Sequence, residues 1–282
     1  MGPLIQNISD TARWVAVFRA EESERPDAIF HDPFARKLAG EKGEQIANAI
    51  EFSKKNSWSF VARTFSFDES IKEHVKRGFD MVINLAAGLD TRPYRMELPA
   101  TLKWVEVDLP GIMNYKETIL SREKPKCILE KIQLDLSDRK ARMELFKQLG
   151  NKSNKALIVS EGLIGYLSEE EAGALAEDLS SQKSFRRWVF DMMSPGLLEL
   201  ATKEMGSFLK EANAPLKFAP QEGEGFFLHY GWKNLESKSS LKTAATLNRL
   251  NDEMMGFASY PEPEGPKGSF PWTGVCLFEN VN

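Results

Sequence analysis

The sequence predicts an α/β fold in which helices cover both faces of a mostly parallel sheet. From about residue 80 onward, short apolar runs alternate with amphipathic helical patterns, which is typical of parallel sheets. The first 79 residues show helical patterns and no strand pattern. The chain has 282 residues, of which 42% are apolar and 28% charged, so it is long and apolar enough for one large domain.

The predicted strands and helices follow one another closely in the central part of the chain. Five apolar runs are expected to form strands, namely 81–86, 102–107, 127–134, 156–160 and 187–192. Pro110 suits the first turn of a helix. Ser137 is expected to cap a second helix that ends at Gly150. Ser168 and Glu171 form a capping-box pattern at the start of a third helix.

The first 79 residues are expected to form helices that cover one end of the sheet as a lid. Asp32 with Pro33 is expected to open one short helix that Gly40 closes. Asp68 is expected to open another helix, which ends near Gly78.

The region after residue 192 is less regular. It is expected to contain helices at 195–211 and about 239–256, a Pro/Gly-rich stretch at 214–225 and a last strand at 275–278. We see no internal repeat and no linker, so we expect a single domain in three parts. These parts are a helical lid (1–79), a core of alternating strands and helices that is expected to hold the ligand site (80–192) and a region that adds to that site and supplies the final strands (193–282).

The composition argues against several classes of protein. The formal net charge is −4, and Lys and Arg are interspersed with Glu and Asp, which argues against a nucleic-acid partner. The sequence has no apolar run near the ~20 residues that cross a bilayer and no secretory pattern, so we expect no membrane contact and a cytoplasmic location. Two cysteines and three histidines stand apart in the sequence, so neither disulfides nor a metal site are expected.

A glycine or a carboxylate follows each of the first four predicted strands. Gly88 follows the first strand, Asp108 ends the second, Asp135 follows the third and Glu161 follows the fourth. Ligands of open parallel sheets bind beyond these strand ends, so the four residues are expected to face one site. Taken singly, Asp108 fits a helix cap as well as a ribose contact, and Asp135 fits an ordinary loop acid.

This combination favours a cofactor that contains adenosine, without choosing between NAD and S-adenosylmethionine. A dinucleotide site normally has the pattern G-x-G-x-x-G, whereas the turn here has a single glycine, Gly88. A pyrophosphate needs several backbone N–H groups, and S-adenosylmethionine has no phosphate. An acidic edge also suits a sulfonium and an ammonium group. The turn therefore favours S-adenosylmethionine, with S-adenosylhomocysteine as the product.

Several motifs resemble one family in their order along the chain. VARTFSFDESI, VINLAAGLDTRPYR, WVEVDLP, LDLSD and EGLIGYLSEEE occur as in the leucine carboxyl methyltransferase family, and DPFARKLAG resembles the N-terminal helix of its bacterial members. The family includes protein phosphatase methyltransferases and polyketide carboxyl O-methyltransferases. The resemblance covers roughly residues 30–192. It implies a class I S-adenosylmethionine-dependent methyltransferase fold, which is a Rossmann-like, seven-stranded, mostly parallel sheet with an N-terminal helical lid.

The resemblance also implies roles for individual residues. Gly88 matches the glycine that lies against the cofactor, and Asp108 matches the acid that holds the ribose hydroxyls. Glu161 matches the acid near the methionine end of the cofactor. Arg63 matches the arginine that reaches from the N-terminal segment to the cofactor's carboxylate.

The resemblance also concerns the loop after the third predicted strand and one residue of the turn after the first. Asp135 and Leu136 match the pair beside the adenine. The family usually has a glycine where this chain has Ala86. The extra methyl group is expected to narrow the pocket or shift the turn, and so to affect cofactor affinity rather than the fold.

Arg95 and Tyr166 are the candidate catalytic residues. Arg95, like its neighbour Arg92, either forms structural ion pairs or holds the carboxylate of the acceptor in a bidentate manner. Tyr166 either points into the acceptor pocket or packs under the lid. Both alternatives remain open for each residue at the level of the sequence.

The sequence therefore predicts an S-adenosylmethionine-dependent O-methyltransferase that acts on the carboxylate of a small molecule. A carboxylate is already a nucleophile at neutral pH, so in-line transfer needs alignment and desolvation rather than a strong base. A protein C-terminus is a less favoured acceptor. The alternatives are a NAD-dependent oxidoreductase and a cofactor-binding protein without catalysis.

Overall fold

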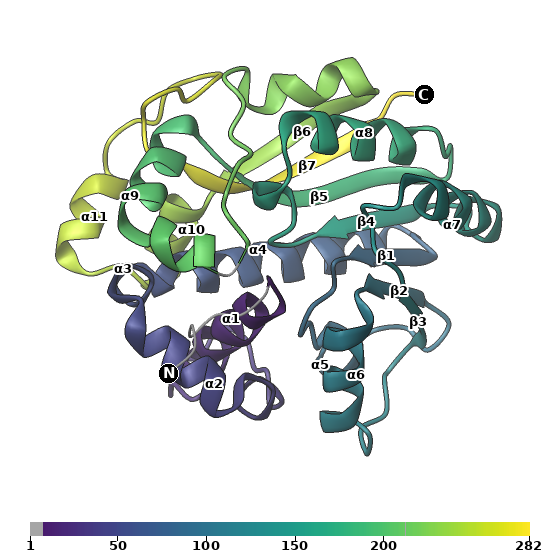
Figure 1. The fold of residues 1–282 in the computed structure, drawn as a ribbon, viewed down its shortest axis with the longest axis horizontal. Coiled ribbons are helices and arrows are strands. Elements are labelled where there is room, and N and C mark those ends of the chain that lie inside the picture. The colour runs from purple at the N-terminus through teal and green to yellow at the C-terminus, as the bar shows by residue number, and fades with distance from the viewer. Residues whose placement is uncertain (1–7, 212) are drawn as a thin grey trace.

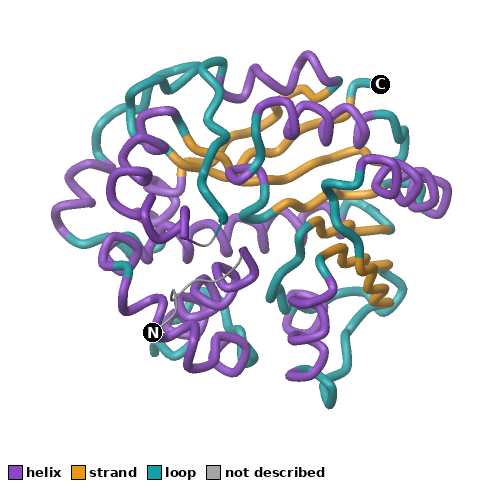
Figure 2. Tube along the Cα trace, in the orientation of Figure 1, coloured by secondary structure: helices purple, strands orange, loops and turns teal. Residues whose placement is uncertain are grey.

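The computed structural model describes residues 8–211 and 213–282, and these residues contain one seven-stranded sheet. The strands, drawn in orange in Figure 2, follow the order β3-β2-β1-β4-β5-β7-β6. The strands are β1 (Met81–Leu85), β2 (Lys103–Asp108), β3 (Ile128–Gln133), β4 (Ala156–Ser160), β5 (Phe185–Met193), β6 (Trp232–Ser239) and β7 (Thr273–Asn280). The first five are parallel to their neighbours, whereas β7 runs antiparallel between β5 and β6. The predicted mostly parallel sheet is thus confirmed.

The helices precede and separate the strands (Figure 1). Before the sheet come α1 (Ile8–Ser23), α2 (Ala35–Ala49), α3 (Glu51–Lys55) and α4 (Ser57–Lys76). Between the strands lie α5 (Arg92–Arg95), α6 (Pro110–Ile119), α7 (Arg139–Lys152), η1 (Ile164–Tyr166), α8 (Glu169–Ser180), α9 (Pro195–Glu211), η2 (Gly223–Tyr230), α10 (Ser240–Thr246) and α11 (Asp252–Ala258). None of the described helices has the length and apolar character that a membrane crossing requires.

Alternate side chains of the central strands fill the core on the two faces of the sheet. In β4, Ile158 packs with α7 and α8 on one face, whereas Leu157 and Val159 pack with Phe67 and Ile71 of α4 on the other. This alternation follows from the two-residue period of a strand, and burial on both faces explains the continuous apolar runs in the sequence.

The order of the strands determines where a ligand can bind. The chain runs outward from β1 through β2 to β3 and then returns to β4, which pairs with β1 on its other side, so the direction of the connections reverses between β1 and β4. Such a reversal opens a crevice beyond the carboxyl ends of the two strands. Here that crevice lies beyond Leu85 of β1 and Ser160 of β4.

Some predicted helix boundaries are wrong, and the structure gives the reasons. Asp68 does not open a helix but lies buried in the middle of α4, where Arg92 and Arg95 pair with it. Asp138, not Ser137, caps α7, because its side chain accepts the backbone N–H of Ala141.

The helix α7 also continues past Gly150 to Lys152. A side chain at Gly150 would place its Cβ 2.5 Å from the side-chain oxygen of Gln182. This glycine therefore permits close packing and does not mark the end of the helix. The capping box of Ser168 and Glu171, by contrast, is confirmed, with both of its hydrogen bonds present.

The C-terminal third also differs from the expectation. The helix predicted at about 239–256 is divided into α10 and α11, and Asn248 between them has a left-handed φ of 55°. This turn directs Arg249 toward α1, where its Nε and Nη2 atoms lie 2.9 and 2.8 Å from the two carboxylate oxygens of Glu22. Strand β6 is a further element that the sequence pattern did not predict.

Candidate functional site

A cavity of about 950 Å³ lies at the carboxyl ends of the parallel strands. Its size falls at the upper end of the range for small-molecule and cofactor sites. It is lined by residues of α1, α4, α9 and α11 as well as by the loops that follow the strands. All eight site residues predicted from the sequence line it, namely Arg63, Gly88, Arg95, Asp108, Asp135, Leu136, Glu161 and Tyr166.

The turn after β1 forms one wall of the cavity. Ala86 and Gly88 both have left-handed backbones, with φ values of 52° and 50°. The N–H of Gly88 donates a hydrogen bond of 2.6 Å to Oδ2 of Asp108. A Cβ added at Gly88 would lie 3.4 Å from Cβ of Ala12 in α1, so this glycine is enclosed between β2 and the first helix.

Asp108 ends β2 and keeps acceptor capacity toward the cavity. Its Oδ1 atom accepts the N–H of Leu109 at 2.7 Å, in addition to the bond from Gly88. Burial raises the pKa of this carboxyl, and the two backbone hydrogen bonds act in the opposite direction. A carboxylate offers about four lone-pair sites, so two backbone bonds leave room for the hydroxyl groups of a ligand.

Asp135 and Leu136 lie together on the loop after β3. Asp135 is exposed, and the backbone N–H of Ser137 donates to its Oδ1 atom at 2.9 Å. That hydrogen bond holds the pKa of Asp135 below its ordinary value. The carbonyl of Leu136 accepts Nη1 of Arg142 at 2.6 Å, which anchors this loop to α7.

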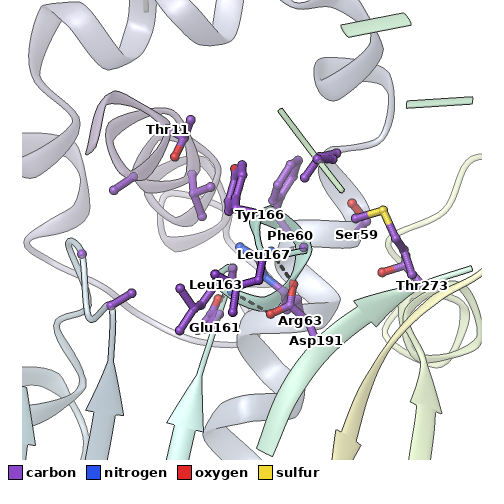
Figure 3. A pocket seen from close by; sticks show the side chains of 18 of the residues that line it. Thr11, Ser59, Phe60, Arg63, Glu161, Leu163, Tyr166, Leu167, Asp191 and Thr273 are labelled. Atoms are coloured by element: carbon purple, nitrogen blue, oxygen red, sulfur yellow. Dashed lines mark hydrogen bonds and ion pairs between the residues drawn. The ribbon is translucent and has the colours of Figure 1, made fainter. Parts of the chain in front are cut away.

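Arg63 of α4 reaches over the ends of β4 and β5 and joins two carboxylates (Figure 3). Its Nε atom lies 3.2 Å from Oε1 of Glu161, and its Nη1 atom lies 3.0 Å from Oδ2 of Asp191. Asp191 also accepts the N–H of Gly162 at 2.6 Å. The three charged side chains therefore fix one another where the sheet faces the cavity.

Arg92 extends this arrangement into the interior. Its side chain is 2% exposed and lies 2.8 Å from Oε2 of Glu161, 2.9 Å from Oδ2 of Asp90 and 2.6 Å from Oδ1 of Asp68. Burial alone would raise the pKa of Asp90. Nearby positive charges, chiefly that of Arg92, outweigh this effect and lower the pKa to about 2. A buried charge is costly unless it is paired, which explains why this arginine is surrounded by three carboxylates.

Arg95 binds Asp68 with both terminal nitrogens, at 2.6 and 2.7 Å. Its side chain is 5% exposed. Of the two roles left open by the sequence, this geometry favours the structural one over contact with an acceptor. Its predicted catalytic role stays a prediction.

Tyr166 lies in η1 and lines the cavity beside Phe60 and Leu167 (Figure 3). Burial raises the pKa of its phenol, against the opposing effects of a hydrogen bond with Thr11 and the charge of Arg63. The phenol is therefore neutral at physiological pH. It can donate a hydrogen bond to a ligand, but it cannot act as a base.

Three acids of the site were not predicted from the sequence. Asp191 lies inside the apolar run 187–192 and was interpreted only as part of a strand. The sequence pattern predicts Asp68 only as a helix start and contains Asp90 only as part of the turn after β1. A charged residue within an otherwise buried strand was the available signal for Asp191, because it needs a partner.

The expectation that the protein has no metal site comes from the spacing of its cysteines and histidines in the sequence. Among residues 8–211 and 213–282, no group of three His, Cys, Asp or Glu side chains is arranged to hold a metal ion.

Comparison with solved structures shows that the fold is shared. A DUF574 family protein from Streptomyces avermitilis MA-4680 superposes with a TM-score of 0.61 at 14% identity, covering 96% of this chain and 97% of that one. A protein from Thermobifida fusca YX, named a "putative methyltransferase", gives 0.59 at 13% identity, covering 99% and 96%. At these identities the likeness concerns the fold alone, and it agrees with the predicted class I methyltransferase sheet.

Sequence comparison identifies the family. A curated relative in Parafrankia sp. (strain EAN1pec), named "Putative S-adenosyl-L-methionine-dependent methyltransferase", is 31% identical over 183 residues. That alignment covers 61% of this chain and 59% of the relative's own length. The family model described as leucine carboxyl methyltransferase matches residues 12–180, so the match begins before the motifs noted in the sequence. Because this match spans more than half of the chain, the protein belongs to the leucine carboxyl methyltransferase family.

Proposed function

We propose that this protein binds S-adenosylmethionine and transfers its methyl group to a carboxylate oxygen of a small-molecule acid. One observation carries the proposal. Eight residues chosen from the sequence, which lie between positions 63 and 166, line a single cavity at the switch point of the sheet. Family membership supports the same reaction class.

The side chains around the cavity fit the chemical groups of this cofactor. Asp108 has free acceptor sites for ribose hydroxyls, and Gly88 lines the cavity without a side chain, which suits the approach of a ligand to its backbone. Glu161 and Asp191 suit an ammonium group, and Arg63 suits a carboxylate. Asp135 and Leu136 are assigned to the adenine side. When bound, the cofactor supplies an electrophilic methyl group.

The lining of the cavity also favours a carboxylate as the acceptor. Among its described lining residues there is no His, Cys or Lys, and the phenol of Tyr166 is neutral. A hydroxyl acceptor would need a base, whereas a carboxylate already carries its nucleophilic electron pair. The carboxylate oxygen forms the new bond to carbon while the sulfur–methyl bond breaks and its electrons stay on sulfur. No proton has to move.

Calorimetric titration with S-adenosylhomocysteine and methyl transfer from labelled S-adenosylmethionine to a panel of organic acids test this proposal. We expect the titration to show binding and the Asp108→Ala variant to bind about 10- to 100-fold more weakly, because hydrogen bonds to a charged group contribute about 1.5–3 kcal/mol. Glu130→Ala, which removes an exposed acid from β3, is the matched control. Well-folded protein that binds neither form of the cofactor would refute the proposal.

Transfer to alcohols but not to acids would contradict the assigned acceptor. NAD binding in place of S-adenosylhomocysteine would support an oxidoreductase instead.

A further inference from the structure

The cavity continues from the charged cluster into a second part with a different lining. This part, here called the apolar compartment, comprises the lining residues at 52–60 and those beyond residue 192. Ser59 and Thr273 of this compartment lie on the opposite side of Arg63 from Glu161 and Leu163 (Figure 3). Close to Tyr166, a Cβ added at Gly165 would be 3.6 Å from the methyl group of Met193, which belongs to the same compartment.

One face of α9 forms the longest wall of the apolar compartment. The residues on this face are Leu197, Leu200, Ala201, Met205 and Leu209. Their spacing of three or four residues places them along one side of a helix. At 1.5 Å per residue, the face extends for about 18 Å from its first leucine to its last.

The other walls of the compartment carry both apolar side chains and uncharged polar ones, which include Ser53, Asn56, Ser239, Ser240 and Thr273. Phe52 and Trp58 contribute from α3 and α4, and Met254 and Phe257 contribute from α11. Among the described residues of this compartment, Glu262 is the only ionisable one, and its carboxylate accepts Nε1 of Trp272 at 3.1 Å. A long apolar wall without a free cation does not suit a polar or multiply charged acceptor.

Large apolar side chains stand at the surface where the compartment opens. Leu200 is 37% exposed and Phe257 is 56% exposed, and both line the cavity. Helix α11 contains no buried residue. Both side chains are therefore placed to contact the apolar part of a ligand that enters the cavity.

We propose that the acceptor is an amphipathic monocarboxylic acid with an extended apolar body, of the straight-chain fatty acid type. The carboxylate of the acid lies beside Tyr166, and its hydrocarbon body lies along the face of α9 that lines the apolar compartment. This inference rests on the proposed methyl transfer for its reaction and on the apolar compartment for its substrate class. The products are the methyl ester of the acid and S-adenosylhomocysteine.

The test is the affinity for butyric, octanoic, dodecanoic and hexadecanoic acids, measured by calorimetry with S-adenosylhomocysteine present. Burial of one methylene contributes about 0.8 kcal/mol, so Kd is expected to fall roughly fourfold per added methylene until the compartment is full. KM for labelled methyl transfer is expected to follow the same order. Equal affinity along the series would overturn the inference, as would preference for a peptide that ends in leucine.

Substitutions at the mouth provide the matched comparison. Phe257→Glu and Leu200→Glu place a charge on the rim at exposed positions, where the fold tolerates it. Both are expected to weaken binding of dodecanoic acid more than tenfold while leaving butyric acid and S-adenosylhomocysteine unaffected. Met255→Glu is the control, because Met255 is 39% exposed on the same helix and does not line the cavity.

These results separate the two proposals. Loss of chain-length dependence with normal S-adenosylhomocysteine binding refutes only the substrate class. Absence of S-adenosylhomocysteine binding refutes the proposed methyl transfer. In that case the effect of Phe257→Glu on the affinity for dodecanoic acid still tests whether the apolar compartment binds acids. An equal effect of Met255→Glu and Phe257→Glu would overturn the assignment of the mouth.

Discussion

Ala86 occupies a backbone conformation that disfavours any residue with a Cβ atom. Its φ of 52° lies in the left-handed region, which costs an ordinary L-residue roughly 1–2 kcal/mol. The sequence marked this position as a departure from the family, and the structure shows that the departure falls on strained backbone next to Gly88. We infer that the turn keeps this strain because β1, β2 and α1 enclose it.

Ala86→Gly is expected to raise the melting temperature. Glycine removes the left-handed strain, but it also increases the conformational entropy of the unfolded chain, which offsets part of the gain in stability. The net gain in the free energy of unfolding is about 0.5–1 kcal/mol, which corresponds to a rise in melting temperature of about 1–4 °C for a domain of this size. Scanning calorimetry measures the change. Ala87→Gly is the control: Ala87 is 7% exposed and has no positive φ, so it should lose stability. A fall in both variants would show that the φ of Ala86 carries no strain.

The sequence predicted site residues where a local rule applies. Gly88, Asp108 and Glu161 follow buried strands, and strand ends in a parallel sheet meet at one edge. The pairing of Arg95 with Asp68 could not be predicted, because it joins residues 27 positions apart through the packing of α4 on α5. Whether an arginine near a helix start faces a ligand or a buried acid depends on that packing.

At the scale of elements, ion pairs connect the end of the sheet to α4. Asp68 lies inside this helix with its side chain 4% exposed, between the guanidinium groups of Arg92 and Arg95 in α5. Burial alone would raise the pKa of Asp68, but the two positive charges outweigh it and hold the pKa below its usual value. The charge on Asp68 therefore stabilises the docking of α4 against α5.

Asp68→Ala is expected to lower the free energy of unfolding by about 3–5 kcal/mol, because it removes the carboxylate that binds both terminal nitrogens of the buried Arg95 and one of the three carboxylates around Arg92. The pKa of Asp68 is lower in the folded than in the unfolded state, so its stabilisation is complete above pH ~4 and is lost as pH falls further. Denaturant titrations at several pH values should show the difference between variant and wild type narrowing in acid.

Glu69→Ala is the control for this experiment, because Glu69 is an exposed residue of α4 that pairs with Lys72. It is expected to change stability by less than about 0.5 kcal/mol. A gap between Asp68→Ala and wild type that stays constant down to pH ~2 would contradict the assigned role of the ionised carboxylate.

The elements that the sequence did not predict depend on contacts distant in the chain. Strand β6 has a polar, partly exposed pattern and is held as an edge strand by pairing with β7. The break between α10 and α11 depends on Asn248 and on the partner that Arg249 finds in α1. The central strands and the Ser168 capping box were predictable because burial on two faces and a local hydrogen-bond pattern specify them.

At the scale of the whole molecule, the N-terminal helices and the C-terminal third meet around one cavity. Thr11, Ala12, Trp14 and Val15 of α1 line it opposite the strand ends. The proposal that residues 1–79 act as a lid follows from this placement, and residues 1–7 lie outside the described part of the chain.

S-adenosylhomocysteine is therefore expected to slow amide hydrogen exchange in α1 and in the first half of α4. A ligand that contacts these helices stabilises their closed state and lowers the rate of local opening. Exchange measured by mass spectrometry, with and without the ligand, tests this. The segment η2 contributes no lining residue and should change little. Protection confined to the strand ends would show that the helices do not close over the cofactor.

The pair of Arg249 and Glu22 has a consequence for the order in which the protein is assembled. The two residues are 227 positions apart, and Glu22 is 2% exposed. During synthesis, α1 leaves the ribosome long before Arg249 does, so for most of translation Glu22 can pair with Arg25, whose Nε atom lies 3.8 Å from its Oε2 atom, but not with Arg249. The ion pair that joins α1 to the segment after α10 therefore forms only after Arg249 has been synthesised, whereas the packing of α1 on α2 can form earlier.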